Sequence, residues 1–390
     1  MKFLIMNQHT LNFGDDIAGV SLINQILKLF PSRSTAIQIV YNTPGSLNYP
    51  DQRVSDRNDV LLKDMGRVQI LLFMFFSFLG IQVVYKSSLK AFKKMVQDAN
   101  VILVSPGGAN LGMYKDWRYL IKLYMVVILG GRPVFHNNTI EYSNNWLFNI
   151  FEKVILKNSR IYVRELSSYN HLQEKGFFPV RGVDTAFSFV NDNTDPLVSG
   201  NYIVFIPTNL DSWHPNFREE PLSDEIKKTI LKELSELSKQ KSLPIVILQH
   251  MHGSAVEESL YDECKRKLVE FGAKTVNIPQ IENCYQYDNV IRNSQFVVSM
   301  RYHGIVMAIK NKIPFCSLEY ENKMAEVCRY AQLTDLNIKL KNIDKKFNLM
   351  DYYTLGTKEI SDKGPLISKI KDMATRPLKQ FKYGLTSEID

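Results

Sequence analysis

Short apolar runs alternate with longer amphipathic stretches from one end of the chain to the other. The amphipathic stretches, such as 224–240 and 257–271, carry apolar residues at the spacing of one helix face. The apolar runs are rich in Val and Ile and do not alternate with polar residues, which is typical of parallel strands covered by helices on both faces. They predict strands at 2–6, 36–41, 100–105, 132–136, 160–163, 201–207, 242–249, 273–278, 294–300 and 313–318.

The polar run at 191–200 (NDNTDPLVSG) divides these strands into two series and is the expected linker. We therefore predict an α/β protein of two Rossmann-like domains that face a central cleft, the layout of GT-B-type transferases. Residues 1–192 would form the first domain and residues 200–330 the second. The lysine-rich residues 331–390 are expected to be a basic, solvated C-terminal extension. In such folds, ligands bind at the carboxyl ends of the strands.

The run at 68–85 (VQILLFMFFSFLGIQVVY) breaks the alternation because it is almost wholly apolar. It is about as long as the shortest membrane spans, but a span would place the strands before and after it on opposite sides of a bilayer. Two interpretations remain: a buried helix of the first domain, or a helix or helical hairpin that lies in the cytoplasmic leaflet. In the second, the flanking basic residues would contact lipid phosphates, namely Lys63, Arg67, Lys86, Lys90, Lys93 and Lys94.

Composition narrows the choice of partners. Hydrophobic residues make up 45% of the chain and charged residues 23%, the balance of a globular protein. The net charge of +8 and the pI near 9.0 favour anionic partners, but no RNP-like or helix-turn-helix motif supports nucleic acid. The four cysteines form no CxxC pair, and no metal-ligand cluster is visible in the sequence. The apolar run at the N-terminus is too short for a signal peptide. We therefore expect a cytoplasmic protein without a bound metal.

The most informative stretch is 294–323. A predicted strand ends at Met300, and Arg301, Tyr302 and His303 follow directly before a predicted helix. Free backbone N–H groups and the helix dipole make this place suitable for a small polyanion. Arginine matches the paired oxygens of a carboxylate or phosphate, and histidine can transfer a proton near neutral pH. The alternative is an ordinary helix start with a solvated arginine.

The run S-x-R-Y-H-x(4)-A-x(5)-P-x(5)-Y-x-x-K resembles the C-terminal signature of the polysaccharide pyruvyl transferase family. It is matched by Ser299, Arg301, His303, Ala308, Pro314, Tyr320 and Lys323. Four earlier segments resemble other motifs of the family: NFGDDIAG (12–19), SPGGANLG (105–112), YVRELSS (162–168) and VDTAF (183–187). The resemblance extends from about residue 1 to residue 325. The glycine loop departs from the three adjacent glycines of many relatives, and TNLDSW after the strand at 201–207 lacks an arginine that relatives often have.

The resemblance implies a transferase that moves the enolpyruvyl group of phosphoenolpyruvate onto two hydroxyls of one sugar. The product would be a pyruvate ketal in a capsule, an exopolysaccharide or a cell-wall polysaccharide. Phosphoenolpyruvate is then a substrate, and no cofactor is implied. The acceptor is expected to be a sugar or a lipid-linked oligosaccharide, bound by the first domain, while the second binds the donor. Peripheral contact with the cytoplasmic face of the membrane would follow from the apolar run at 68–85.

The matched motifs also imply roles for single residues. For catalysis we expect His303 as the acid that protonates C3 of phosphoenolpyruvate, and Asp15, Asp16 or Asp184 as the base, with Asp15 and Asp184 taken as catalytic. The residues expected to bind the donor are Arg301, Tyr302, Arg164, Ser299 and His250. Those expected to bind the acceptor are Asn12, Gly14, Asp16, Gly107, Gly108 and Asn110. For His250 and His252, a surface loop is the simpler interpretation.

Two other functions fit the same residues less fully. A GT-B glycosyltransferase would use the same pair of domains with a nucleotide-sugar donor. A non-catalytic basic module would bind a membrane or nucleic acid without needing His303.

Overall fold

The computed structural model of the chain describes residues 1–57, 67–79 and 87–386. These residues divide into two compact units. The first unit comprises Met1–Leu11, Ala18–Phe189 and Met373–Asp390, and the second comprises Asn12–Ile17 and Val190–Asp372.

The main junction between the units, at Phe189, lies beside the predicted linker at 191–200. The prediction that residues 1–192 belong to one domain is wrong for Asn12–Ile17, which group with the second unit. The reason is local pairing: Asn12 forms an antiparallel bridge with Met251 of the second unit. Sequence periodicity does not register such a pairing, because it joins residues far apart along the chain.

The first unit contains a seven-stranded parallel sheet in the order β3-β2-β1-β4-β5-β6-β7. Its strands are β1 (Lys2–Gln8), β2 (Ala36–Tyr41), β3 (Val54–Arg57), β4 (Val101–Val104), β5 (Pro133–Asn138), β6 (Arg160–Val163) and β7 (Val180–Arg181). Its helices are α1 (Phe13–Leu29), α2 (Arg67–Phe78), α3 (Ser87–Asp98), α4 (Trp117–Ile128), α5 (Trp146–Lys157), α6 (Leu166–Glu174) and the 3₁₀ helix η1 (Thr185–Ser188).

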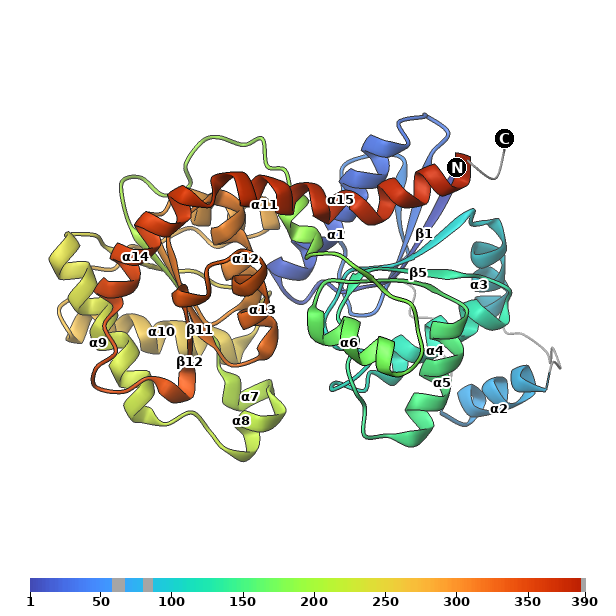
Figure 1. The fold of residues 1–390 in the computed structure, drawn as a ribbon, viewed down its shortest axis with the longest axis horizontal. Helices are drawn as coiled ribbons and strands as arrows, with labels where there is room; N and C mark the ends of the chain where they lie inside the picture. Colours follow the sequence, from blue (N-terminus) through green and yellow to red (C-terminus); the bar gives the residue numbers. More distant parts are fainter. Residues whose placement is uncertain (58–66, 80–86, 387–390) are drawn as a thin grey trace. The chain divides into compact units, whose positions relative to one another are not determined.

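Helices cover both faces of the first sheet (Figure 1), which explains why its strands lack polar alternation. On one face, α3, α4 and α5 bury an apolar cluster that includes Phe92, Leu123 and Phe148. On the other face, α1 and the end of α15 (Gly364–Thr386) pack through side chains such as Ile23 and Leu378. The crossovers bring every loop that follows a strand to one edge, the carboxyl edge, where ligands bind in such sheets.

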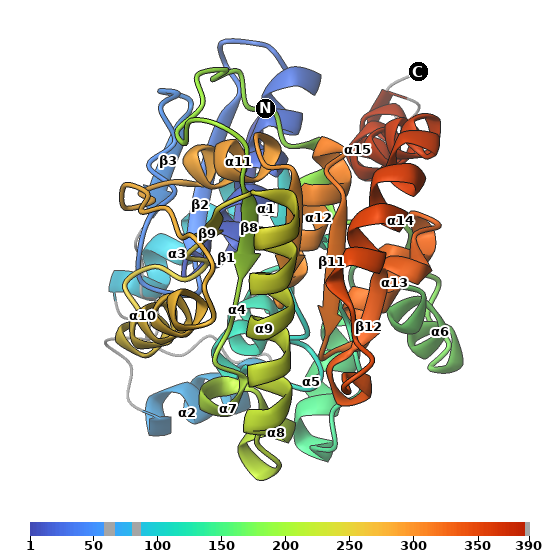
Figure 2. The same cartoon turned by 90° about the vertical axis from the view of Figure 1, so that its left-hand side faces the viewer.

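The second unit contains a five-stranded parallel sheet in the order β12-β11-β10-β8-β9. Its strands are β8 (Ile203–Ile206), β9 (Ile245–Ile247), β10 (Phe296–Ser299), β11 (Phe315–Glu319) and β12 (Asn337–Lys339). Its helices are α7 (Leu210–Trp213), α8 (Pro215–Glu219), α9 (Asp224–Lys241), α10 (Ala255–Glu270), α11 (Cys284–Arg292), α12 (Tyr302–Asn311), α13 (Asn322–Tyr330), η2 (Thr334–Leu336), η3 (Leu340–Asn342) and α14 (Leu349–Asp362). Figure 2 shows α9 and α10 running alongside the sheet, which they cover through Leu234 and Leu268.

Two predictions about the second unit are wrong. The strand expected at 273–278 is absent from the described sheet, where only Thr275 pairs, in an isolated bridge with Ile245. Residues 331–390 are not a solvated extension, because β12 is an edge strand of the sheet and α14 packs against α9 and β11. Lysines such as Lys345, Lys346, Lys358 and Lys369 are exposed, whereas buried side chains such as Leu349 anchor the segment.

The apolar run at 68–85 is described only in part, as α2 and Leu79, and residues 80–85 lie outside the described residues. The interpretation as a buried helix is wrong for the described part, because five of its apolar side chains are 48% to 68% exposed. These are Val68, Leu71, Leu72, Phe75 and Leu79. Within residues 1–57, 67–79 and 87–386, none of the helices combines the length and apolar character that crossing a bilayer requires.

Candidate active site

Four loops lie side by side at the carboxyl edge of the second sheet, because β11, β10, β8 and β9 are neighbours in it. The loops comprise residues 207–213 after β8, 248–254 after β9, 300–303 after β10 and 320–323 after β11. Each carries charged or aromatic side chains. Since ligands bind at this edge of parallel sheets, we take these loops as the candidate active site.

Arg301 is the central cation of this site and is only 7% exposed. Its Nη2 donates to Oε1 of Glu257 at 2.8 Å, and its Cζ lies 5.3 Å from the centre of the Trp213 ring. Its Nε is buried and has no hydrogen-bond partner among the described residues. The guanidinium therefore keeps a donor that matches a carboxylate or phosphate oxygen.

Glu257 holds Arg301 and the loop after β8 together. This carboxylate lies in the first turn of α10 and is 3% exposed. Its Oε1 also accepts hydrogen bonds from Thr208 Oγ1 at 3.1 Å and from the backbone N–H of Asn209 at 3.2 Å, and its Oε2 accepts one from Tyr261 at 3.0 Å. Sequence analysis does not single out Glu257, because an acidic residue in a first helical turn is ordinary.

Ser299 shapes the turn that presents Arg301. Its Oγ accepts a hydrogen bond from the Arg301 N–H at 3.0 Å and donates one to the Arg301 carbonyl at 2.8 Å. The hydroxyl is fully buried and holds this backbone in place, while the expected role of Ser299 in donor binding stays a prediction. Gly304 is needed beside it, because a Cβ there would lie 2.4 Å from the Ser299 hydroxyl.

His303 lies in the first turn of α12, against the N-terminal turn of the chain. A Cβ on Gly14 would lie 2.1 Å from His303 Nδ1, so only glycine permits this close approach. The turn is fixed by the Phe13 N–H, which donates to the His250 carbonyl at 3.1 Å. Gly14, expected to bind the acceptor, therefore lies beside the expected catalytic histidine.

The neighbouring polar residues of this turn have distinct partners. Asn12 caps α1, since its Oδ1 accepts from the Asp15 N–H at 2.9 Å and its Nδ2 donates to the Asp15 carboxylate at 2.7 Å. Asp16 instead lies beside the loop after β9, with its Oδ2 2.7 Å from Nε2 of His252. Burial raises the pKa of Asp16 above its usual value, and His252 offsets part of this effect. A carboxylate with a raised pKa is a stronger base.

His250 is buried, so the surface-loop interpretation is wrong for this residue. Its Nδ1 lies 2.9 Å from the Tyr287 hydroxyl, and its ring stacks 6.4 Å from the ring of His303. Burial holds the pKa of His250 well below its usual value, and the positive charges of Arg301, His303, His252 and Lys323 lower it further. A lowered pKa favours the neutral form of His250.

Lys323 adds a further cation from the loop after β11. Its Nζ lies 2.5 Å from Oε2 of Glu321 and 6.0 Å from the centre of the Tyr302 ring. Burial alone would raise the pKa of Glu321, but the attraction of Lys323 and His214 outweighs it and lowers the pKa to about 2. Arg301, His252, His303 and Lys323 are called the cationic cluster below. Three of its members are each held by one carboxylate.

Arg164 and Asp184 belong to the first unit, so the structure does not group them with Arg301 and His303. Arg164 Nη1 donates to Asp184 at 2.5 Å, and its Nε donates to Glu165 at 3.2 Å and to Thr139 at 3.0 Å. Asp184 is fully buried and also accepts from the Ala186 N–H. The two side chains thus neutralise each other inside the first unit.

The glycine loop at 105–112 follows β4 at the carboxyl edge of the first sheet. A Cβ would meet ordinary contacts at Gly107, 3.4 Å from Asn110, and at Gly108, 3.7 Å from Tyr114. Neither glycine is required by packing within the protein. Polar side chains that sequence analysis misses lie at the ends of β1, β2 and α4, where Asn42 bonds to Asp116 at 2.7 Å and to Lys122 at 3.2 Å.

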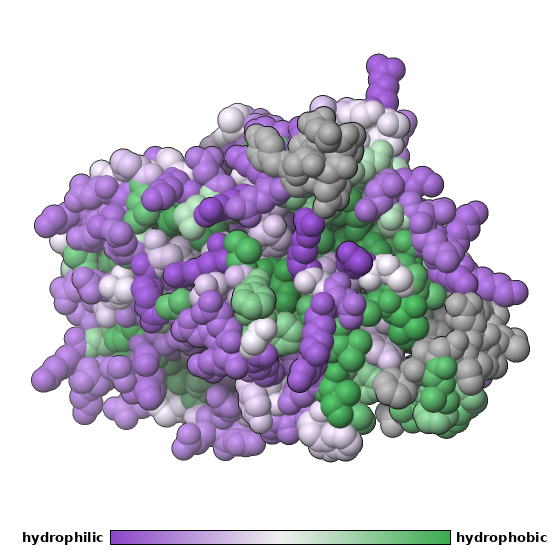
Figure 3. Space-filling model, turned by 45° about the vertical axis from the view of Figure 1, so that its right-hand side comes forward, coloured by the Kyte–Doolittle hydropathy of each residue, from purple (hydrophilic) through white to green (hydrophobic). Residues whose placement is uncertain are grey.

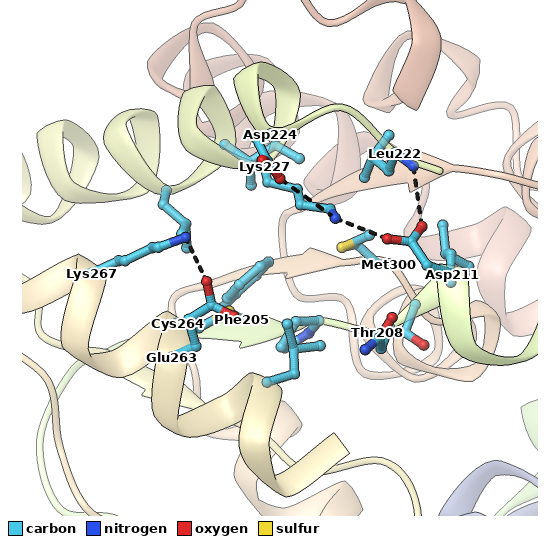
Figure 4. A pocket seen from close by; sticks show the side chains of 16 residues that line it. Phe205, Thr208, Asp211, Leu222, Asp224, Lys227, Glu263, Cys264, Lys267 and Met300 are labelled. Atoms are coloured by element: carbon cyan, nitrogen blue, oxygen red, sulfur yellow. Dashed lines mark hydrogen bonds and ion pairs between the residues drawn. The ribbon is translucent and has the colours of Figure 1, made fainter. Parts of the chain in front are cut away.

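A pocket of about 210 Å³ opens between α9 and α10 at the end of β8 (Figure 4). Phe205, Leu222, Cys264 and Met300 give it an apolar floor. Both of its lysines are in ion pairs, Lys227 with Asp211 at 2.9 Å and Lys267 with Glu263 at 2.5 Å. The pocket borders the candidate active site through the loop after β8, including Thr208 and Asn209. Arg301, by contrast, has a buried Nε without a hydrogen-bond partner among the described residues, which makes it the better candidate for binding a small anion.

In the part of the chain that the structure describes, no group of three or more His, Cys, Asp or Glu side chains is arranged to hold a metal ion. Glu257, Glu321 and the Asp16–His252 pair are the site residues that sequence analysis misses or underrates. Their positions could have identified them, since each follows or faces the carboxyl end of a predicted strand, where ligands bind.

Comparison with known proteins gave one family and many similar folds. A family model described as polysaccharide pyruvyl transferase matches residues 12–322, while no curated protein gave a significant match. A putative UDP-N-acetylglucosamine 2-epimerase from Listeria monocytogenes has a TM-score of 0.63 at 12% identity, covering 99% of this chain and 97% of the other. A glycosyltransferase from Rickettsia africae has a TM-score of 0.61 at 12% identity, covering 97% of each chain. The UDP-GlcNAc 2-epimerase from Neisseria meningitidis, bound to UDP-GlcNAc, has a TM-score of 0.56 at 12% identity, covering 98% and 100%. These similarities identify the fold as GT-B-like.

Proposed function

Because the chain belongs to the polysaccharide pyruvyl transferase family, we propose that it transfers the pyruvyl group of phosphoenolpyruvate to two hydroxyls of a sugar. The observation that carries the proposal is the cationic cluster, in which His303 follows Arg301 at the end of β10. A donor with a carboxylate, a phosphate and a carbon that must be protonated needs this combination of groups.

In this proposal the second unit binds the donor. Arg301 takes the carboxylate, since its Nε is available while Glu257 holds its Nη2. Lys323 and the N–H groups at the start of α12 take the phosphate, because a helix N-terminus and an ammonium group both favour negative charge. The nearby carboxylates keep the cations oriented before the donor arrives, which lowers the cost of ordering them during binding.

His303, as an imidazolium, then donates its proton to C3 of phosphoenolpyruvate, which makes C2 electrophilic. A general acid of this kind contributes roughly 10²–10⁴-fold in rate. His250 stacks on His303 and favours its neutral form, so it does not add a second positive charge that would repel the imidazolium of His303. Bound phosphate would favour the protonated form of His303, since an opposite charge stabilises an imidazolium.

We assign Asp16 as the base that accepts the proton of the first sugar hydroxyl as its oxygen bonds to C2. Its raised pKa and its contact with His252 support this choice over Asp15, which is bonded to Asn12. The C2–O bond to phosphate then breaks, and a second hydroxyl attacks C2 to close the ketal. The proton of the second hydroxyl restores the imidazolium of His303. The proton held by Asp16 passes to the departing phosphate, which returns Asp16 to its carboxylate form.

We assign acceptor binding to the first unit. The glycine loop at 105–112 and the polar side chains around Asn42 and Asp116 supply the amide, carboxylate and backbone groups that sugar hydroxyls require. The buried pair of Arg164 and Asp184 supports this edge from beneath and is omitted from the chemistry.

The test is to incubate the protein with phosphoenolpyruvate and a panel of simple and lipid-linked glycosides, following inorganic phosphate and the mass of the sugar. The expected product gains the mass of one pyruvic acid minus one water, and phosphate release depends on the sugar. Arg301→Ala should abolish turnover, and His303→Ala should lower it roughly 10²–10⁴-fold, in both cases with the folded state retained. Full turnover by either folded variant would contradict the assigned roles.

The same panel separates the alternative function. A glycosyltransferase would consume a nucleotide sugar, release a nucleoside diphosphate and ignore phosphoenolpyruvate. Its structural neighbours, one of them bound to UDP-GlcNAc, share the fold at 12% identity, which carries no information about the donor of this chain.

A further inference from the structure

α2 presents an apolar face to solvent rather than to the protein. Val68, Leu71, Leu72, Phe75 and Leu79 follow the spacing i, i+3, i+4, i+7 and i+11, which places them on one side of the helix. Ile70 packs against the apolar cluster beneath α3, α4 and α5 and anchors the helix there. A helix of a soluble protein normally turns such a stripe towards the core, so an exposed stripe marks an interaction surface.

The start of α5 adds a second apolar group at the same end of the first unit. Trp146, Leu147 and Ile150 are 73%, 39% and 48% exposed. Figures 1 and 2 both place α2 and α5 at the lower end of this unit. Figure 3 shows the apolar side chains of this end gathered into green patches at the lower right. Tryptophan is the residue that most favours the boundary between lipid and water.

The topology ties this surface to the proposed acceptor site. α5 follows β5 after a short loop, so its start lies at the carboxyl edge of the first sheet. Figures 1 and 2 place α2 at the same end of the unit as α5. The glycine loop at 105–112 lies at the same edge. A membrane that contacts α2 would therefore border the edge to which we assign the sugar.

The charge of the surrounding sequence indicates which partner binds this apolar surface. From residue 67 to residue 94 the sequence has five basic residues and no Asp or Glu, the basic ones being Arg67, Lys86, Lys90, Lys93 and Lys94. Lys90 and Lys94 are exposed on α3, and Lys153 and Lys157 are exposed on α5. Exposed apolar side chains on α2 and α5, together with exposed lysines on α3 and α5, fit a bilayer with anionic headgroups. A second copy of the chain would instead bring like charges together.

We infer that α2 and the start of α5 dock the protein on an anionic membrane surface, with the apolar stripe among the acyl chains and the lysines on lipid phosphates. The consequence for substrate choice rests on the proposed function: the sugar acceptor is carried by a lipid embedded in the same membrane. Docking itself requires neither phosphoenolpyruvate nor a sugar, so the two ideas are tested separately.

The test of docking is co-sedimentation of the full chain with vesicles of phosphatidylcholine, with and without phosphatidylglycerol, in the absence of substrates. The wild type should bind the anionic vesicles. The double variant Leu71→Gln and Phe75→Gln should bind at least about tenfold more weakly, because two apolar side chains no longer gain from burial in lipid. Removing Lys90 and Lys94 as serine variants should weaken binding by about fivefold per lysine at low salt.

The matched control is Val256→Gln with Val269→Gln, which removes two exposed valines from α10 of the second unit and should leave vesicle binding unchanged. Docking is overturned if the wild type ignores anionic vesicles or if the α2 variant binds them equally well. It is also overturned if the wild type is a dimer that the α2 variant converts to a monomer without vesicle binding.

The lipid-linked acceptor is tested by comparing two substrates. The α2 variant should keep wild-type turnover of a soluble glycoside and lose turnover of the same sugar on a lipid in vesicles. Equal losses on both substrates would contradict the lipid-linked acceptor. Absence of turnover by wild type on every sugar would contradict the proposed function and leave the docking result standing.

Discussion

Gly14→Ala tests the contact between the N-terminal turn and His303 with a change of one methyl group. The added Cβ would lie 2.1 Å from Nδ1, 2.3 Å from Cγ and 2.6 Å from Cβ of His303. Because carbon atoms in contact are about 3.5–4.0 Å apart, the imidazole must move by more than about 1 Å. A displacement of that size at a catalytic group costs on the order of a hundredfold in rate.

The same substitution should destabilise the protein only moderately. Gly14 lies in the first turn of α1, where alanine favours the helix by up to about 1 kcal/mol, whereas overpacking against the histidine costs about 1–3 kcal/mol. The helix preference offsets part of the overpacking, so we expect a folded variant whose melting temperature falls by a few degrees. Its turnover, measured as phosphate released from phosphoenolpyruvate with a sugar acceptor, should fall about a hundredfold, far more than this loss of stability explains.

A double-mutant cycle identifies the route of the effect. If Gly14→Ala acts only through the imidazole, it should cause no further loss in a His303→Ala background. A second loss of similar size in that background would refute the reasoning, as would wild-type turnover by the single variant.

Three further predictions follow from the geometry. Glu257→Ala leaves Arg301 buried without its carboxylate, so the free energy of unfolding measured in urea should fall by about 3–5 kcal/mol. Inorganic phosphate should then stabilise the variant more than the wild type, and equal stabilisation would argue against Arg301 as an anion-binding group. Gly108→Ala places a methyl 3.7 Å from Tyr114, an ordinary contact, so the melting temperature should not change. The KM for the sugar should rise at least about tenfold, and an unchanged KM would remove this loop from acceptor binding. Burial raises the pKa of Asp16 above 3.8, so its contribution to stability is full below that pH and is lost as the pH rises through the folded-state pKa. Relative to Asp16→Asn, the wild type should therefore lose stability in urea titrations as the pH rises above 3.8. Parallel stability profiles of the two proteins would contradict this.

Features that depend on local pattern could be predicted from the sequence. The strand at 36–41 has the predicted bounds, and the predicted helix at 224–240 is α9. Both could be predicted because the burial of one or both faces of an element determines which positions of the sequence are apolar. The turn that places Arg301 before a helix was visible for the same reason. The strand expected at 273–278 shows the limit, since this run pairs with β9 only through the isolated bridge between Thr275 and Ile245.

Features that depend on distant partners could not be predicted. The pair of Asp16 and His252 joins residues 236 positions apart, and Glu257 reaches Arg301 across 44 positions. No periodicity records such contacts. The same limitation explains the role of Ser299, whose side chain looks like a ligand-binding hydroxyl in the sequence and serves the backbone in the fold. It also explains the error about the C-terminal residues, whose buried side chains are spread among exposed lysines.

The membership of the two units has a consequence for protein engineering. Asn12–Ile17 belong to the second unit although they precede nearly all of the first, and residues from Met373 onwards belong to the first although they follow the second. If the chain were cut at the linker, the C-terminal fragment would lack Gly14, which contacts His303. The N-terminal fragment would lack Leu378, which belongs to its apolar core. Hybrid enzymes made by joining halves of two relatives at residue 190 should therefore fail. A hybrid should fold more readily if Asn12–Ile17 come from the same relative as the second unit and the residues from Met373 onwards come from the same relative as the first.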